Sequence, residues 1–358
     1  VVGILINPEL EKGAKGVIGV RVRPESAKVL SQSLLSKEIM QERLNFAEIR
    51  EKHQGLIDML LQQAVFTIDE AQKLLVELKE DRAISDELKE KILVTIKMLV
   101  NNTMIDSLTL REVKALIWQI IWVYAKSPFQ LQKREADEDA LITTDYLIST
   151  LDKTPELDKR LELAMKIAAL SNISIFDRRL SKDLTDNNLD IVKRFEGIIS
   201  RIINGVDTKQ LLTLIQDTGY IAIDDTKYII ERLLRVPKEE RKNKIIIFNI
   251  YNAGEVVYML VLVREILKLG YKVVLAGNPA PLDDNYDVFD LRRLLEEPVV
   301  ADRKFLGNFL TNGKIKIISN GSPSSGIDVR ETSSEIFGIA KDDNTEMMIS
   351  IGYDLTES

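Results

Sequence analysis

The chain has 358 residues, of which 45% are hydrophobic and 29% are charged, so it has the composition of a folded globular protein and a length that predicts two domains or one enlarged domain. Its formal net charge of -7 gives no global attraction to nucleic acids or to anionic membranes. The absence of cysteine excludes disulfides, thiolate metal sites and cysteine nucleophiles, and it favours a cytoplasmic location.

The first segment, residues 1–25, contains two short runs rich in valine and isoleucine, VVGILI and VIGVRV. The stretch between them contains a proline and two glycines, which punctuate turns. This pattern predicts a short β hairpin or a pair of edge strands.

Residues 26–235 show a helical period in almost every segment, which predicts a large all-helical region. The stretch from Thr67 to Glu70 (TIDE) resembles a capping box and predicts a helix start. The most apolar stretch, Ala115 to Ala125, has about half of the roughly 20 residues that a membrane span needs. We therefore expect a buried helix there, with Trp118 and Trp122 in the core, and neither a transmembrane nor a signal segment.

The pattern changes in residues 236–358, where short β-branched runs alternate with helical ones. Lys244 to Tyr251 reads as a strand, Val256 to Leu269 as a helix that is apolar nearly all round, and Tyr271 to Ala276 as a second strand. Further strands are expected over Lys314 to Ser319 and Met347 to Ile351. The alternation predicts a C-terminal, Rossmann-like α/β domain with a largely parallel sheet and helices on both faces.

The turn Asn252-Ala-Gly-Glu255 separates the first strand of this domain from its apolar helix, a position at which α/β proteins bind ligands. Gly254 allows close approach of a ligand or of a neighbouring backbone, Asn252 offers a carbonyl to a cation or an amide to an anion, and Glu255 is a candidate oxygen ligand or base. The alternative interpretation is that Asn252 and Glu255 only cap the helix.

Two more polar loops are expected at the same sheet edge, because the carboxyl ends of parallel strands lie side by side. The first, the acidic loop from Gly277 to Asp287, contains Asp284 and two other acids together with the amide Asn285, and it suits a hard cation such as Mg²⁺ or Mn²⁺. It is equally a solvated loop that caps the next helix. The second offers Ser322, Ser324 and Ser325 to a phosphate. The only histidine, His53, lies in a charged helical stretch, which argues against histidine-based sites.

These motifs resemble the damage-control phosphatases, a family of metal-dependent phosphatases once classed as a domain of unknown function. The resemblance is carried by NAGEVVY, LKLGYKVVLAG and PLDDN, by the loop from Asn320 to Gly326, and by Ser127 to Phe129 and Leu161 to Phe176 upstream. It covers roughly Ser127 to Ser358. It implies an α/β fold, a divalent cation (Mg, Mn, Co or Ni) and a small phosphorylated metabolite as substrate.

The chain departs from the family at its centre. The resemblance implies that Asn252, Asp284 and Asn285 hold the metal, that Glu255 and Asp284 are catalytic, and that Gly254, Ser322, Ser324 and Ser325 bind phosphate. The family's first metal-binding Asp is Tyr251 here, its later Asp aligns with Asn285, and further Asp positions are Met259 and Ile175.

Two functions follow from this pattern. The chain is either a divergent metal-dependent phosphatase, or a catalytically dead relative that binds a ligand or a protein or ribonucleoprotein partner, in which case no cofactor is needed. Loss of a carboxylate removes both an oxygen ligand and a negative charge from a Mg²⁺ or Mn²⁺ site, which favours the second hypothesis.

Overall fold

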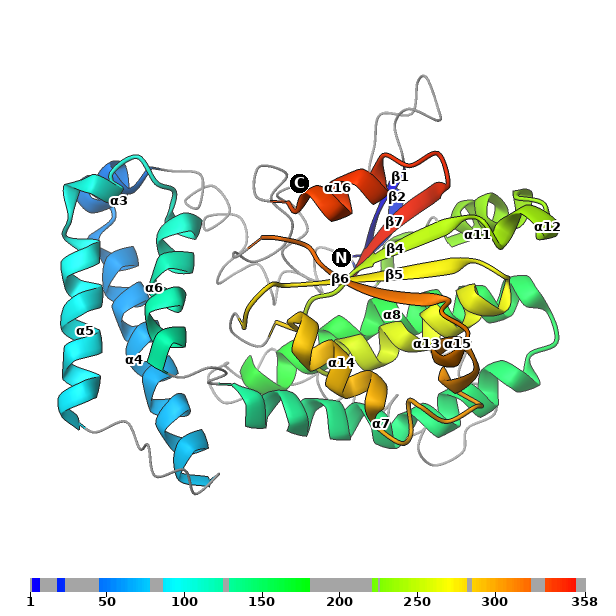
Figure 1. Cartoon of the computed structure of the whole chain (residues 1–358), viewed down its shortest axis with the longest axis horizontal. Helices are drawn as coiled ribbons and strands as arrows, with labels where there is room; N and C mark the ends of the chain where they lie inside the picture. Colours follow the sequence, from blue (N-terminus) through cyan, green and yellow to red (C-terminus); the bar gives the residue numbers. More distant parts are fainter. Residues whose placement is uncertain are drawn as a thin grey trace.

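The structure is a computed structural model and describes residues 2–6, 18–22, 45–77, 86–124, 129–180, 221–224, 226–281, 285–322 and 332–351. A twisted sheet runs through the larger part of the molecule, and four of the helices gather at one side of it, on the left in Figure 1. The helical region and the α/β region that the sequence predicts are both present, so the predicted fold class is confirmed.

The four helices at the side have a core of their own. They are α3 (Phe46–Lys52), α4 (Gln54–Glu77), α5 (Asp86–Val100) and α6 (Leu110–Tyr124). A short 3-10 helix, η2 (Thr103–Ile105), lies between α5 and α6. Their buried side chains, Phe46 and Ile96 among them, form a separate cluster from the core under the sheet. These four helices therefore do not depend on the sheet for their hydrophobic core.

Two sequence-based expectations in this region were wrong in detail. Thr67 does not start a helix but lies inside α4, where its hydroxyl donates to the carbonyl oxygen of Gln63 at 2.9 Å. Such a bond, one helical turn back, lets threonine sit within a helix instead of capping it. Trp118 is buried beside Phe129, with ring centroids 5.8 Å apart, but Trp122 is 41% exposed.

The sheet has seven strands among the described residues, in the order β3-β2-β1-β7-β4-β5-β6. Four of them are parallel and belong to the C-terminal region: β4 (Ile245–Asn249), β5 (Lys272–Gly277), β6 (Ile315–Ser319) and β7 (Thr345–Ile351). The other three are antiparallel to their neighbours: β1 (Val2–Ile6), β2 (Ile18–Val22) and β3 (Ile221–Asp224). The N-terminal pair thus extends the C-terminal sheet, because β1 pairs with β7.

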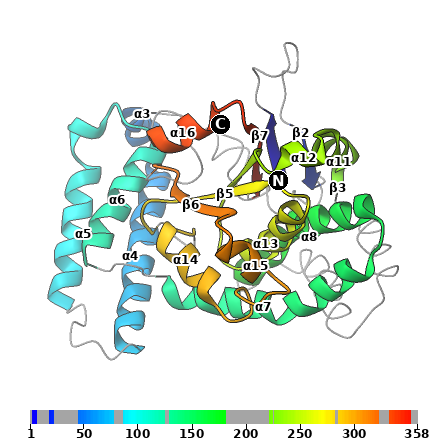
Figure 2. The same ribbon diagram turned by 45° about the vertical axis from the view of Figure 1, so that its right-hand side comes forward.

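Helices cover both faces of the parallel strands, as Figures 1 and 2 show. On one face, Ile246 and Phe248 of β4 pack in the same core as α13 (Glu255–Lys268), which is covered in turn by α7 (Gln130–Lys153) and α8 (Leu157–Leu180). On the other face, Ile247 packs with Ile336 of α16 (Ser334–Ala340). Because α13 lies between the sheet and two helices, it is apolar nearly all round.

The remaining helices complete the layers. They are α11 (Thr226–Arg235), α12 (Lys238–Arg241), α14 (Val288–Glu296) and α15 (Gly307–Thr311). Helix α14 begins directly after the acidic loop and packs on β5 and β6. Within the described residues, none of the helices has the length and hydropathy to cross a membrane.

Candidate functional site

The turn between β4 and α13 is held by its own side chains and by a carboxylate from another layer. Gly254 occupies the N-cap of α13 with a φ of 73°, a conformation that glycine adopts without strain. Its N–H donates to Oδ1 of Asp137 in α7 at 2.9 Å. The side-chain nitrogen of Asn252 donates to the Glu255 carboxylate at 3.2 Å. The N-cap residue of α13 is Gly254, which has no side chain, so the alternative in which Asn252 and Glu255 only cap the helix stays an interpretation.

The acidic loop lies beside this turn. Asn252 and Asn285 form an isolated antiparallel bridge, and the N–H of Tyr286 donates to the carbonyl oxygen of Tyr251 at 2.6 Å. Asp287 caps α14 by accepting from the N–H groups of Phe289 and Asp290 at 2.7 and 2.8 Å. The structure therefore brings Asn252, Glu255 and Asn285 together, whereas Asp284 lies outside the described residues.

The third polar loop at this sheet edge, from Asn320 to Gly326, is described only at its start. Ser322 is buried, and its N–H donates to Oδ1 of Asn320 at 3.0 Å. Ser324 and Ser325 lie outside the described residues. The predicted phosphate-binding role of this loop thus stays a prediction.

Asp137 is the centre of a buried network that sequence reasoning missed. Besides the N–H of Gly254, its carboxylate accepts from the hydroxyl of Tyr286 and from the Arg293 guanidinium at 3.2 Å. Burial raises the pKa of Asp137, while these three hydrogen bonds oppose the rise. Burial also holds the pKa of Tyr286 well above its ordinary value, so the phenol stays protonated and its hydroxyl donates a hydrogen bond to Asp137.

Lys133, one helical turn before Asp137 in α7, is the second buried charge from this layer. Its side chain is 0% exposed, and Nζ donates to the backbone carbonyl of Asn285 and to Oδ2 of Asp290, both at 2.6 Å. The ammonium of Lys133 therefore lies directly against the loop that the sequence predicted to hold a cation. Burial and the neighbouring Asp290 raise the pKa of Asp287, and the charge of Lys133 opposes that rise.

A row of buried polar side chains crosses the carboxyl ends of the four parallel strands. Each of these residues comes two positions after a strand residue that packs in the core on the face covered by α16. Because side chains two positions apart on a strand lie on the same face, all four are placed on the face of the sheet that α16 covers. The row consists of Ser350 on β7, Asn249 on β4, Asn278 after β5 and Asn320 after β6. It thus has one polar residue for each parallel strand.

Only part of this row is internally hydrogen-bonded. The amide nitrogen of Asn320 donates to Oδ1 of Asn278 at 2.8 Å. Asn249 pairs in register with Ser350 and is 1% exposed, yet neither atom of its side-chain amide has a hydrogen-bond partner in the described part of the chain. The amide nitrogen of Asn278 likewise has no partner there. Buried amide groups are nearly always hydrogen-bonded, so these free donors and acceptors require a functional or structural explanation.

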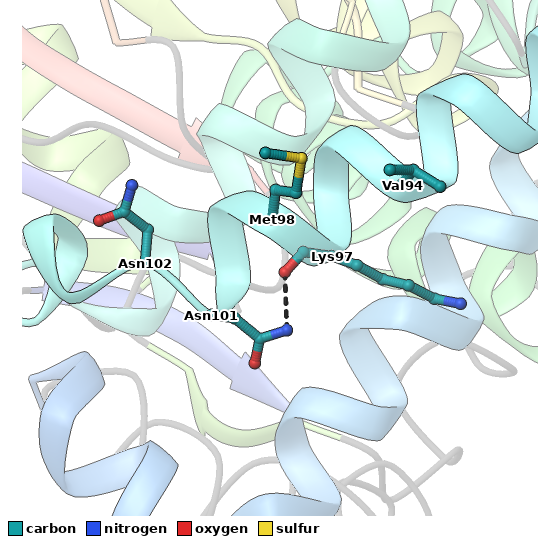
Figure 3. Close-up of a pocket in the computed structure, with 5 residues that line it drawn as sticks. All are labelled: Val94, Lys97, Met98, Asn101 and Asn102. Atoms are coloured by element: carbon teal, nitrogen blue, oxygen red, sulfur yellow. Dashed lines mark hydrogen bonds between the residues drawn. The ribbon is translucent and has the colours of Figure 1, made fainter.

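A separate hollow lies at the end of α5, in the helical region. It has a volume of about 410 Å³ and is lined by Val94, Lys97, Met98, Asn101 and Asn102, which Figure 3 shows as sticks. The Asn101 amide donates to the carbonyl oxygen of Lys97 at 2.9 Å. These five residues include no carboxylate and no residue of the turn, so we do not count the hollow as part of the candidate site.

Comparison with known proteins decides the family. The sequence profile of the damage-control phosphatase ARMT1-like domain matches residues 53–352. The chain belongs to this family. Its members are metal-dependent phosphatases that act on small phosphorylated metabolites. The resemblance drawn from the sequence motifs is thereby confirmed.

Solved structures and curated proteins were also compared with the chain. The crystal structure of a DUF89 family protein from Pyrococcus horikoshii is similar, with 18% sequence identity, a TM-score of 0.49, and coverage of 78% of this chain and 78% of that chain. The search of curated proteins gave no match.

Family membership raises the question of whether the site fits a divalent cation. Within the described ranges, no group of three or more Asp, Glu, His or Cys side chains is arranged to hold a metal. The described donors are the amides of Asn252 and Asn285 and the carboxylate of Glu255, and the Lys133 ammonium contacts Asn285. One carboxylate beside a fixed positive charge is a poor fit for Mg²⁺ or Mn²⁺, which prefer several charged oxygens.

The three positions at which the chain departs from the family differ in their surroundings. Tyr251 is 5% exposed, and its backbone oxygen accepts from Tyr286. Met259 is 1% exposed and packs in the core around α13. Ile175 lies in α8, in a stretch whose side chains are not described. An apolar residue at Met259 suits a helix that is covered on all sides.

The sequence did contain a signal for Lys133 and Asp137. In α7 the buried residues Lys133, Asp137, Ala140, Thr144 and Leu147 follow one another at intervals of three or four, the spacing of a single helix face. Two opposite charges on a face that is otherwise apolar or small indicate buried partners. Their partners lie more than a hundred residues further along the chain, so periodicity alone did not identify them.

Proposed function

We propose that this chain is a damage-control phosphatase family member that binds a small phosphorylated metabolite at the carboxyl edge of its sheet and does not hydrolyse it through a metal ion. The observation that carries the proposal is that each carboxylate the structure describes beside the turn already has a hydrogen-bond or ion-pair partner within the protein. Asp137 accepts from Gly254, Asp290 pairs with Lys133, Asp287 caps α14, and Glu255 accepts from Asn252.

These contacts oppose metal binding for a physical reason. A carboxylate that already neutralises a buried cation cannot turn to a metal without leaving that cation unpaired, which costs about 3–5 kcal/mol for a buried pair. Asp290, 6% exposed, faces this cost because its partner Lys133 is fully buried. Asp287 would lose two hydrogen bonds to the start of α14.

The binding half of the proposal is supported by the free amides. Asn249 and Asn278 offer unpaired donors at the edge where parallel α/β sheets bind ligands. Buried polar groups without partners lower stability, so their presence here is more readily explained by a ligand than by folding. Amide donors of this kind hydrogen-bond to phosphate oxygens and to hydroxyl groups without a metal.

The experiment compares hydrolysis with binding in the same protein. With an aryl phosphate such as 4-nitrophenyl phosphate, we expect no turnover above background in the presence of Mn²⁺, Co²⁺ or Ni²⁺. With EDTA present, the same compound is expected to raise the melting temperature, and Asn249→Leu is expected to abolish that rise. Metal-dependent turnover that disappears in Asp284→Ala would establish the phosphatase hypothesis instead, because Asp284 is the carboxylate that the family resemblance assigns to the metal. The absence of any rise in melting temperature would refute the binding half.

A further inference from the structure

We infer that the exposed face of α5 is a self-association surface, on which a second copy of this chain docks with its own α5 running antiparallel to the first. Helix α5 is amphipathic, and its buried face, with Ile92, Ile96 and Val100, packs in the core of the four helices. Its other face lies at the outer edge of the molecule in Figures 1 and 2. The inference does not rest on the proposed function, because α5 contributes no residue to the candidate site.

Two large apolar side chains lie in the middle of this exposed face. Val94 is 48% exposed, and Met98, one turn further on, is 69% exposed. The exposed face of an amphipathic helix is normally polar. Both side chains also line the hollow of about 410 Å³ at the end of α5, together with Lys97, Asn101 and Asn102 (Figure 3). An exposed apolar pair beside a hollow is suited to bury the side chains of a partner.

The charges of this face point to a second copy as the partner. The first half of α5 carries the exposed acids Asp86, Glu87 and Glu90, whereas the only charged residue of the helix after Lys91 is Lys97. Glu87 pairs with Lys91 at 2.6 Å. Glu90 and Lys97 have no ion-pair partner in the part of the chain that the structure describes. An acidic first half and a basic second half make the face complementary to itself when two copies run antiparallel.

The spacing of the charges gives the register of the pair. Glu90 and Lys97 are two helical turns apart on the same face, with Val94 between them. When two such helices meet antiparallel near Val94, Glu90 of each copy lies opposite Lys97 of the other, so a two-fold axis forms this contact twice. Val94 and Met98 of both copies are then buried at the centre, and the opposed helix dipoles attract each other.

The length of α5 predicts that the dimer is weak. A helix of 15 residues is about 22 Å long. Two helices of that length in contact bury less than the roughly 1,200 Å² at which stable complexes begin. We therefore expect an equilibrium between monomer and dimer that shifts with protein concentration.

Charge reversal tests both the surface and the register. Sedimentation equilibrium of the unaltered protein over about a hundredfold range of concentration is expected to give a mass that rises from one chain towards two. Glu90→Lys and Lys97→Glu are each expected to weaken self-association by about tenfold, because each replaces two attractive contacts by two repulsive ones. An equimolar mixture of the two variants is expected to recover the association, since opposite charges then face each other at both contacts.

A matched control is available at α12, at the other end of the molecule in Figure 1. Glu239→Lys and Lys242→Glu make the same changes of charge there and are expected to leave self-association unchanged. All four side chains are exposed, so the variants are expected to fold, and circular dichroism checks this.

Three results would overturn the inference. They are a mass of one chain at every concentration, α5 variants that associate as strongly as the α12 variants, and a mixture that associates no better than its components. None of these results bears on the proposed function, which is measured by turnover and by the ligand-induced change in melting temperature.

Discussion

The buried amide of Asn249 allows a quantitative prediction about stability, because its effect on the free energy of unfolding can be measured without the ligand that we propose it binds. The side chain is 1% exposed, and neither of its polar atoms has a hydrogen-bond partner among the described residues. Replacing it by leucine, an apolar side chain of similar shape, removes two unsatisfied groups from the interior. We therefore expect Asn249→Leu to be more stable than the unaltered protein.

The magnitude follows from the penalty of burying an amide group without a partner, which is about 1–3 kcal/mol. Some of this gain is offset by imperfect packing of the new side chain, so the expected increase in the free energy of unfolding is about 1–2 kcal/mol. For a chain of this size the melting temperature would rise by a few degrees. The assay is urea unfolding followed by circular dichroism, with thermal unfolding as a second measurement.

Asn320 provides the matched control on the same face of the same sheet. It is also 1% exposed, but its amide nitrogen donates to Asn278 at 2.8 Å and its oxygen accepts from the N–H of Ser322 at 3.0 Å. Asn320→Leu removes both of these buried hydrogen bonds and is expected to lower the free energy of unfolding by about 2 kcal/mol or more. If Asn249→Leu is destabilising to a similar degree, the amide of Asn249 has a structural partner and the reasoning is refuted.

Two further predictions concern the turn. Gly254→Ala forces a residue with a β-carbon into a φ of 73° and is expected to lower the free energy of unfolding by about 1–2 kcal/mol in urea titrations, with no loss contradicting the strained geometry. Burial raises the pKa of Asp137, so in the unaltered protein its contribution to stability is fully present below the ordinary carboxyl pKa of about 4 and is lost as the pH rises through the higher folded value. Asp137→Asn removes this contribution, so the stability of the variant relative to the unaltered protein should improve as the pH rises from about 4. Urea titrations at several pH values measure this difference. If folding instead favoured the ionised form of Asp137, the difference would change in the opposite direction.

The local structure around the site was predictable from short stretches of sequence. The β-branched run before Asn252 and the apolar run after Gly254 predicted a strand, a turn and a helix, and the structure has β4 and α13 there. The side-by-side placement of the turn and the acidic loop also followed from the rule that parallel strands end at one edge. Such features depend on interactions between residues close in sequence, or on a general property of parallel sheets.

What the sequence by itself determined about this protein is its fold class, its family and the location of the polar loops. The tertiary structure alone decided what those loops contact. Asp137 meets Gly254 across 117 residues of sequence, and Lys133 meets Asn285 across 152, because α7 packs on the side of α13 that faces away from the sheet. The pairing of a buried charge depends on which side chain lies within hydrogen-bond distance in the folded chain, and no periodicity or motif encodes that distance.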